Sequence, residues 1–277
     1  MNVKRGFAGA DITALSAIRS PARSRGRHPD HSSRRSAREH ALSSANGFTL
    51  LEAATVLVIV GLLFQALITG QELIQNARVR HIMSQQDAVE SAFEGFQDRF
   101  RAPPGDYSAA SINIDCGPVA CLDGNGDGHI EAGTGGAPHE EILVWQHLGA
   151  AGFLEGRFYL GAPGVSTPTP DNTPRNVFGG YLQIGYDALW GYSGNASPRH
   201  TIKTGNHVPA SVLEEVDRKV DDDKPATGRF QFSVYAGDGA APPVGGTPNG
   251  CTDADTPAAS WITRGAFENC GAATLVR

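Results

Sequence analysis

The sequence predicts an α+β fold, in which one long N-terminal helix packs on a small antiparallel sheet with a loop-rich C-terminal region. Three observations lead to this expectation. An apolar run, residues 53–70, is followed without a break by an amphipathic pattern that reaches residue 101. The sequence after residue 105 is dense in glycine and proline, which favours short elements. The strand-like segments in that part are few and short, as a small sheet requires.

Residues 1–47 differ in charge from the rest of the chain. They hold nine Lys and Arg against three acidic residues, a net charge of +6, whereas residues 48–277 carry −12 and the whole chain −6. A basic block directly before an apolar segment is typical of the cytoplasmic flank of a membrane helix. We therefore expect residues 1–47 to be a leader on the cytoplasmic side. The acidic remainder lies outside, and nucleic acid is not an expected partner.

The N-terminal helix is predicted from two adjoining patterns. The apolar run is near the lower limit of length for crossing a bilayer. From Gln71 to Arg101 no proline occurs, and apolar residues recur at spacings of three, four and seven. One continuous helix is therefore expected from Phe48 to about Arg101, roughly 80 Å at 1.5 Å per residue. Pro103-Pro104-Gly105 ends it, because proline cannot continue the hydrogen-bond ladder.

Shorter elements are expected after residue 105. Residues 139–152 carry acidic residues in the first turn, apolar residues at helical spacing and a terminal glycine, which predicts a helix. A second short helix is predicted from Pro209 to about Val220, followed by Asp221-Asp222-Asp223 as a solvated helix end. Strands are expected at 153–160, 180–186 and 229–235.

The junction before the apolar run reads Gly47-Phe48-Thr49-Leu50-Leu51-Glu52-Ala53. This junction and the helix after it, residues 46–101, resemble the prepilin family, which includes type IV pilins and the pseudopilins of type II secretion. In that family a membrane aspartyl peptidase cuts after the glycine and methylates the new N-terminus. The resemblance implies cleavage after Gly47 and methylation of Phe48. This chain departs from the family in its long leader and in Thr69, where many pilins carry a helix-breaking proline.

Glu52 can be interpreted from its chemistry alone. A carboxylate inside an apolar helix costs about 2.5–3.5 kcal/mol on insertion scales, so it needs a partner. Glu52 lies four residues after the expected new amine on Phe48. An incoming subunit would be drawn to the depth at which a neighbour's amine pairs with its Glu52, because the pair is stronger in a low dielectric. We therefore predict that Glu52 sets the register of assembly.

The expected organisation is a leader (1–47), a transmembrane and polymerisation helix (48–105) and a periplasmic or extracellular head (106–277). The expected function is structural, a subunit of a type IV pilus or a type II secretion pseudopilus-like filament. The precursor is expected as a single-pass protein of the bacterial inner membrane, with prepilin peptidase/methyltransferase and other pilin or pseudopilin subunits as partners. The alternative is a membrane-anchored, calcium-dependent binding module or adhesin that never polymerises.

A candidate calcium loop begins at Asp123. Its alternating residues Asp123, Asn125, Asp127, His129 and Glu131 match the first nine positions of a D-x-N-x-D-G-x-I-x loop, with Gly128 at the sharp turn and Ile130 facing a core. The twelfth position is Thr134 instead of a bidentate Glu, so Glu131, Glu140 or Glu141 has to complete the shell. The alternative is a glycine-rich surface turn, in which Asp and Asn favour tight turns.

The four cysteines, Cys116, Cys121, Cys251 and Cys270, all follow the apolar run. An even number in an exported domain predicts two disulfides. Pairing of near neighbours, Cys116 with Cys121 and Cys251 with Cys270, is the simplest of three possible arrangements, and buried free thiols are the other interpretation.

The sequence shows no catalytic pattern, so an enzyme is not expected. No serine elbow, phosphate-binding loop or dinucleotide fingerprint is present. The spacings of His129, His139 and His147 do not place them on one helical face as zinc ligands, and solvated histidines are the expected interpretation.

Overall fold

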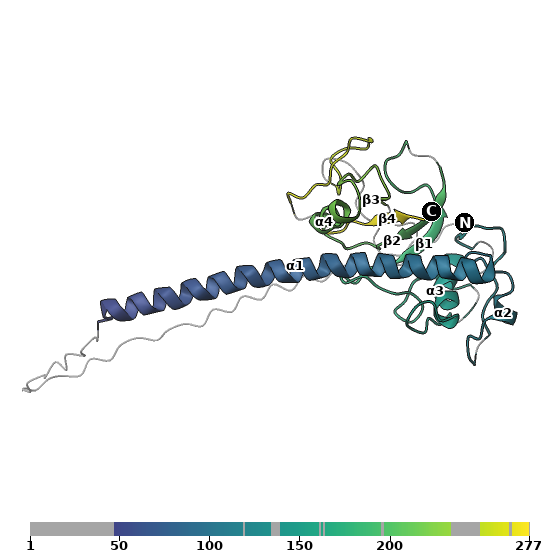
Figure 1. Cartoon of the computed structure of the whole chain (residues 1–277), viewed down its shortest axis with the longest axis horizontal. Coiled ribbons are helices and arrows are strands. Elements are labelled where there is room, and N and C mark those ends of the chain that lie inside the picture. The colour runs from purple at the N-terminus through teal and green to yellow at the C-terminus, as the bar shows by residue number, and fades with distance from the viewer. Residues whose placement is uncertain are drawn as a thin grey trace, which may run out of the picture. The chain divides into compact units, whose positions relative to one another are not determined.

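The computed structural model describes residues 47–118, 120–133, 139–160, 162, 164–194, 197–233, 250–265 and 268–276. The chain divides into two compact units, Met1–Ala53 and Ala54–Arg277. The predicted leader, apart from Gly47, lies outside the described residues. The architecture of the second unit is the predicted α+β fold, a long helix packed on a small antiparallel sheet with loops (Figure 1).

Helix α1 (Leu50–Phe100) forms where the sequence predicts one continuous helix. Its 51 residues correspond to about 76 Å at the usual rise. The helix ends as Arg101 turns into the left-handed region, with φ of 59°, and the chain enters Pro103-Pro104-Gly105. The proline pair then prevents a further helical turn.

The two halves of α1 have different surroundings. Every residue from Leu50 to Leu73 is exposed except Gly70, which is partly exposed. From Val79 onward one stripe is buried, formed by Val79, Ile82, Gln86, Val89, Ala92, Phe93 and Phe96. These residues recur at three and four positions, so they lie on one face of the helix. The amphipathic pattern therefore marks the face that packs on the rest of this unit.

One four-stranded sheet is formed by β1 (Gln183–Asp187), β2 (Arg199–Lys203), β3 (Phe230–Phe232) and β4 (Ala272–Leu275). All pairs are antiparallel and the order is β1-β2-β4-β3. Ile202 of β2 is opposite Ile184 of β1 and Thr274 of β4, which fixes the register. Strand β4 therefore lies between β2 and β3, so the sheet is complete only after the C-terminal segment has paired with both strands.

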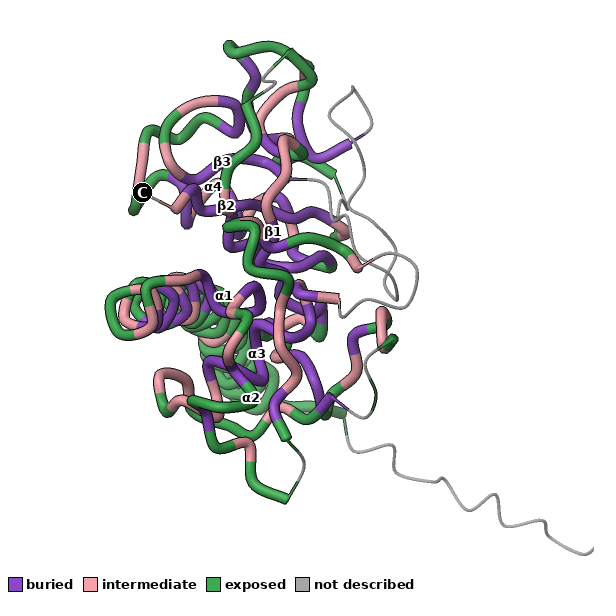
Figure 2. The backbone as a smooth tube through the Cα atoms, turned by 90° about the vertical axis from the view of Figure 1, so that its right-hand side faces the viewer, coloured by how far each residue is buried: buried purple, intermediate pink, exposed green. Residues whose placement is uncertain are grey.

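The helices α2 (Ala110–Asn113), α3 (Glu140–Ala150) and α4 (Ala210–Val220) complete the described elements. The sheet and α4 lie on one side of α1, and α3 and α2 lie on the other (Figures 1 and 2). One apolar core joins Phe93 and Phe96 of α1 to Trp145 of α3 and the β1–β2 pair. A second core joins Val79 and Ile82 of α1 to α4, β3 and β4.

The predictions for short strands were partly wrong. Residues 153–160 form no strand. Gly156 has a φ of 118°, and the Tyr159 N–H donates to the Asp171 carbonyl at 2.8 Å outside any strand ladder. Strands β2 and β4 were not predicted, because Arg-His-Thr-Ile-Lys and Ala-Ala-Thr-Leu lack a clear apolar alternation. The expected strands at 180–186 and 229–235 form as β1 and β3, shifted or shortened, with residues 234 and 235 outside the described residues.

Candidate functional site

The predicted processing junction lies directly before α1. Gly47, Phe48 and Thr49 precede the helix, and the side chain of Phe48 is 79% exposed. Thr49 caps the helix, since its Oγ1 accepts the backbone N–H of Glu52 at 3.2 Å. Glu52 occupies the first turn, where the helix dipole favours an acidic residue. Glu52 therefore has a local role in starting the helix besides the predicted role in assembly.

The first half of α1 presents an apolar helix surface on all its sides. The large apolar residues that are exposed there are Leu50, Leu51, Val56, Leu57, Val58, Ile59, Val60, Leu62, Leu63, Phe64, Leu67, Ile68, Leu73 and Ile74. Such a contiguous exposed surface is far larger than soluble monomers usually show. By length and composition, α1 is able to cross a membrane. The helix therefore needs an apolar surrounding for its first half.

The predicted calcium loop is organised by two carboxylates that lie outside its first nine positions. Asp106 and Glu140 are 1% and 3% exposed. Asp106 accepts the backbone N–H groups of Gly126, Asp127 and Gly128 at 2.6, 3.0 and 2.9 Å. Glu140 accepts those of Asn125 and Glu131 at 2.8 and 3.2 Å. Five backbone donors of the loop therefore point at two buried acids.

The predicted ligands of this loop take different positions. Both carboxylate oxygens of Asp123 accept hydrogen bonds from Ser111, at 2.7 and 2.8 Å, and so fix α2. The Asn125 side chain accepts the N–H of Asp127, and the Asp127 carboxylate accepts that of His129, both as local turns. The His129 ring stacks on Tyr186 with centroids 4.0 Å apart. Gly128 has the expected positive φ and Ile130 is fully buried, as predicted.

An acidic cluster is nevertheless present beside the loop. Carboxylate oxygens of Asp106, Asp127 and Glu140 lie within 4.8 Å of one another. Burial raises the pKa of Glu140 to about 6, with Asp106 and Asp127 adding to the rise, and burial likewise raises the pKa of Asp106. Of the predicted metal ligands only Asp127 belongs to this group of acids, while Glu140 was considered as a completing ligand and Asp106 was missed. Nothing in the spacing of residues 123–131 points to Asp106, which follows the end of α1 in the sequence.

His147 was expected to be solvated, and this expectation was wrong. Its side chain in α3 is fully buried. Nδ1 accepts the Gly105 N–H at 2.9 Å, and Nε2 lies 2.8 Å from the Leu122 carbonyl oxygen. Because a carbonyl only accepts, Nε2 carries the proton and the ring is neutral. Burial lowers the pKa of His147 to about 4, more than the Leu122 carbonyl raises it.

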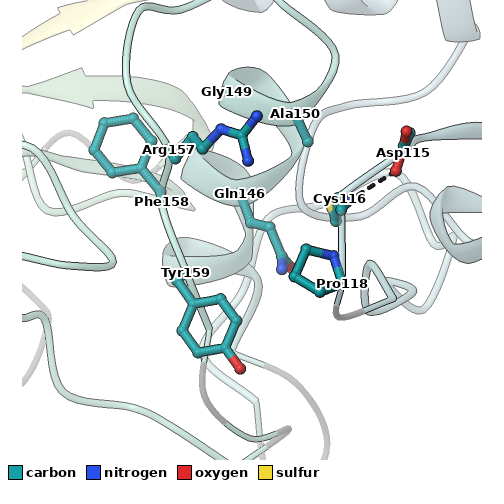
Figure 3. A pocket seen from close by; sticks show the side chains of 10 residues that line it. Asp115, Cys116, Pro118, Gln146, Gly149, Ala150, Arg157, Phe158 and Tyr159 are labelled. Carbon is teal, nitrogen blue, oxygen red and sulfur yellow. Dashed lines mark hydrogen bonds between the residues drawn. The ribbon is translucent and has the colours of Figure 1, made fainter.

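A pocket of about 320 Å³ opens between α3 and the loop at Cys116 (Figure 3). Its described lining includes Asp115, Arg157 and Tyr159, and Gln146 points from α3 toward Pro118. The Oε1 atom of Gln146 is buried and has no hydrogen-bond partner among the described residues. Cys116 belongs to a disulfide, so the lining offers no free thiol. The described lining thus holds an acid and a base, Asp115 and Arg157, and no nucleophile with an adjacent general base.

Both disulfides form between near neighbours, as predicted. Cys116 pairs with Cys121 beside the pocket, and Cys251 pairs with Cys270 at the edge of β4. Cys251 and Cys270 are fully buried in the second core, where they pack with Trp261 and Val208. This bridge therefore ties the segment before β4 into the core.

Comparison with protein-family models, curated proteins and solved structures finds no match to this chain.

Proposed function

We propose that this chain is a structural subunit of a type IV pilin-like filament, either a pilus or a type II secretion pseudopilus. The observation that carries the proposal is the division of α1 into an exposed apolar half and a half whose stripe packs on the sheet. One helix then serves two environments, first a bilayer and later the apolar core of a filament. The prepilin-like junction from Gly47 to Glu52 supplies the expected cleavage site directly before that helix.

Maturation tests the first step of the proposal. A prepilin peptidase shaped for glycine should cut after Gly47, leaving a methylated Phe48 at the new N-terminus. Gly47→Val should block this cut because a branched side chain crowds the scissile bond, and Gly47→Ala should slow it. N-terminal sequencing and the mass of protein from cells decide the matter. Efficient removal of residues 1–47 from the Val variant contradicts the family assignment.

Assembly tests the second step. Glu52→Val removes a charge from the apolar helix surface, so membrane insertion should persist while incorporation into sheared filaments should fall. Gln65→Val is the matched control, since it removes a polar group from the same apolar run without removing a charge. Quantitative blotting of membrane and filament fractions gives the result. The non-polymerising adhesin predicts an uncut leader and no effect of Glu52→Val on where the protein is found.

We further propose that calcium binds at the acidic cluster of Asp106, Asp127 and Glu140. Three carboxylates with two of them buried repel one another, and a hard cation relieves that repulsion. A ligand present at about 100 times its Kd and bound only by the folded state adds roughly 2.7 kcal/mol. Thermal unfolding of the whole protein in detergent, with millimolar calcium against chelator, should show a shift that Asp127→Asn reduces. An equal shift in the variant excludes Asp127 as a ligand.

A further inference from the structure

A second group of carboxylates lies at the C-terminal end of α4, apart from the loop at Asp123. One oxygen each from Asp217, Asp221 and Asp222 lies within 4.8 Å of the others. Calcium binds oxygen at about 2.3–2.6 Å, so oxygens separated by up to about 4.8 Å are able to contact the same ion. The spacing of the three oxygens therefore fits one shared cation.

The carboxylate of Asp217 is the observation that points to a ligand. Its side chain is fully buried, and Oδ2 accepts the indole N–H of Trp261 at 2.7 Å. Its Oδ1 is also buried and has no hydrogen-bond partner among the described residues. A buried anionic oxygen without a donor is unfavourable unless a cation reaches it.

Three cationic side chains at neighbouring positions pair with other acids. Arg218 and Lys219 both pair with Glu215, and Arg229 pairs with Glu90 of α1. Within the described part of the chain, no ion pair joins Asp217, Asp221 or Asp222 to a lysine or arginine. The cluster also lies at the negative end of the α4 dipole, where acidic groups are destabilising.

The loop after α4 holds the other two carboxylates in place. Asp221 Oδ2 accepts the backbone N–H groups of Arg229 and Phe230, and Asp222 Oδ2 accepts the Thr227 hydroxyl at 2.6 Å. Gly228 has a φ of 76°, and a β-carbon there would overlap the Asp221 carboxylate. Asp222 is exposed, so water is able to complete a coordination shell.

We propose that Asp217, Asp221 and Asp222 form a divalent-cation site, with calcium as the ion that its oxygen ligands fit best. The two clusters differ in their hydrogen bonds, since backbone N–H groups contact both buried acids of the cluster at Asp106. At Asp217 no such donor reaches Oδ1 in the described structure. The proposal is independent of filament assembly.

The test uses the whole protein in detergent, stripped of metal with a chelator, in an Asp127→Asn background that removes a carboxylate from the other cluster. Calorimetric titration with Ca²⁺ gives the Kd. Terbium then replaces calcium, and excitation of tryptophan should produce terbium emission, because Trp261 is hydrogen-bonded to Asp217. Asp217→Asn and Asp222→Asn should each weaken binding by about tenfold or more, since affinity follows ligand charge.

Asp223→Asn is the matched control. It removes the same charge from the next position, outside the group of three oxygens, and should change the Kd by less than about twofold. Asp222 is exposed, so its variant remains informative if Asp217→Asn fails to fold. Equal affinities of the Asp222→Asn and Asp223→Asn proteins overturn the proposal. So does a lack of both calcium heat and terbium emission up to about 10 mM, beyond the weakest extracellular sites.

Discussion

At the scale of single residues, buried polar side chains hold the loops of this protein together. His147 reaches from α3 to Gly105 at one side and Leu122 at the other, and so connects the end of α1 to the start of the acidic loop. Asp106 and Glu140 then fix the backbone of that loop. A loop without regular structure obtains its shape in this way from side chains of its neighbours.

The neutral ring of His147 predicts sensitivity to acid. Its pKa is about 4 when folded and 6.5 in the unfolded chain, so the unfolded state binds more protons between these values. The contribution of His147 to the free energy of unfolding is therefore complete above pH 6.5 and is lost as the pH falls toward 4, by about 3 kcal/mol. His147→Gln keeps an acceptor and a donor but does not titrate, so urea unfolding should depend less on pH.

The exposed His81→Gln is the control and should leave the pH dependence unchanged. His200, whose pKa burial lowers to about 4, acts in the same direction and should account for part of the remaining slope. Identical pH profiles for wild type and His147→Gln contradict the assignment of the neutral ring.

Gly124 is predicted to be a position that admits only glycine. A β-carbon there would overlap the backbone of Gly105 and Asp106. Because backbone atoms cannot move aside as flexible side chains do, Gly124→Ala should destabilise the protein by about 1–3 kcal/mol or more. Gly164→Ala, which meets no atom within 4 Å, should stay within about 0.5 kcal/mol. Melting temperatures of both variants, measured in chelator, test the difference.

At the scale of elements, the two disulfides close loops of very different length. Cys116 and Cys121 are 5 residues apart, whereas Cys251 and Cys270 are 19 apart. The longer bridge also lies in a core, between the segment at Trp261 and the start of β4. It connects a segment with little regular structure to the strand that lies inside the sheet.

Removal of the longer bridge should therefore cost more stability. In the chain-entropy description, closing these loops contributes about 3 kcal/mol for the 19-residue separation and about 2 kcal/mol for the 5-residue separation. The double variants Cys251→Ala/Cys270→Ala and Cys116→Ala/Cys121→Ala should show this order in denaturant midpoints. A larger loss of stability from removing the Cys116–Cys121 bridge contradicts this order and indicates that this bridge stabilises the fold by more than loop closure.

At the scale of the whole molecule, the second half of α1 is part of the head's cores and not merely a stalk. Val79, Ile82, Val89, Phe93 and Phe96 of α1 are each at most 2% exposed. At about 2 kcal/mol for each buried large side chain, these residues contribute roughly 10 kcal/mol. That sum is comparable with the entire net stability of a typical domain.

A fragment of residues 75–277 is therefore expected to fold and to be soluble, because it keeps the buried stripe and omits the apolar helix surface. A fragment of residues 106–277 lacks the stripe and should not unfold cooperatively. Circular dichroism during heating, with the disulfides oxidised, distinguishes the two. Cooperative melting of the shorter fragment shows that the sheet and α3 form a core without α1.

Local patterns in the sequence determined much of this protein. The apolar run and the spacing after it predicted α1 and its packed amphipathic half, and the end at Pro103-Pro104-Gly105 was predicted as well. The near-neighbour disulfides, the sharp turn at Gly128 and the anchor at Ile130 were also predicted. In each case the determining contacts lie within a helix turn, a tight turn or a short loop, so periodicity and spacing record them.

Tertiary structure alone decided the rest. It paired β2 with β4 and placed the Asp106 carboxylate within hydrogen-bond distance of the Asp127 N–H. It also buried His147 and joined Asp217 to Trp261, which lies 44 residues away in the sequence. Asp221-Asp222-Asp223 was interpreted from the sequence as a solvated helix end, and nothing in that pattern pointed to the buried Asp217 beside it. Burial and long-range hydrogen bonds depend on which segments meet after the chain has folded, and a local pattern of residue types does not contain that information.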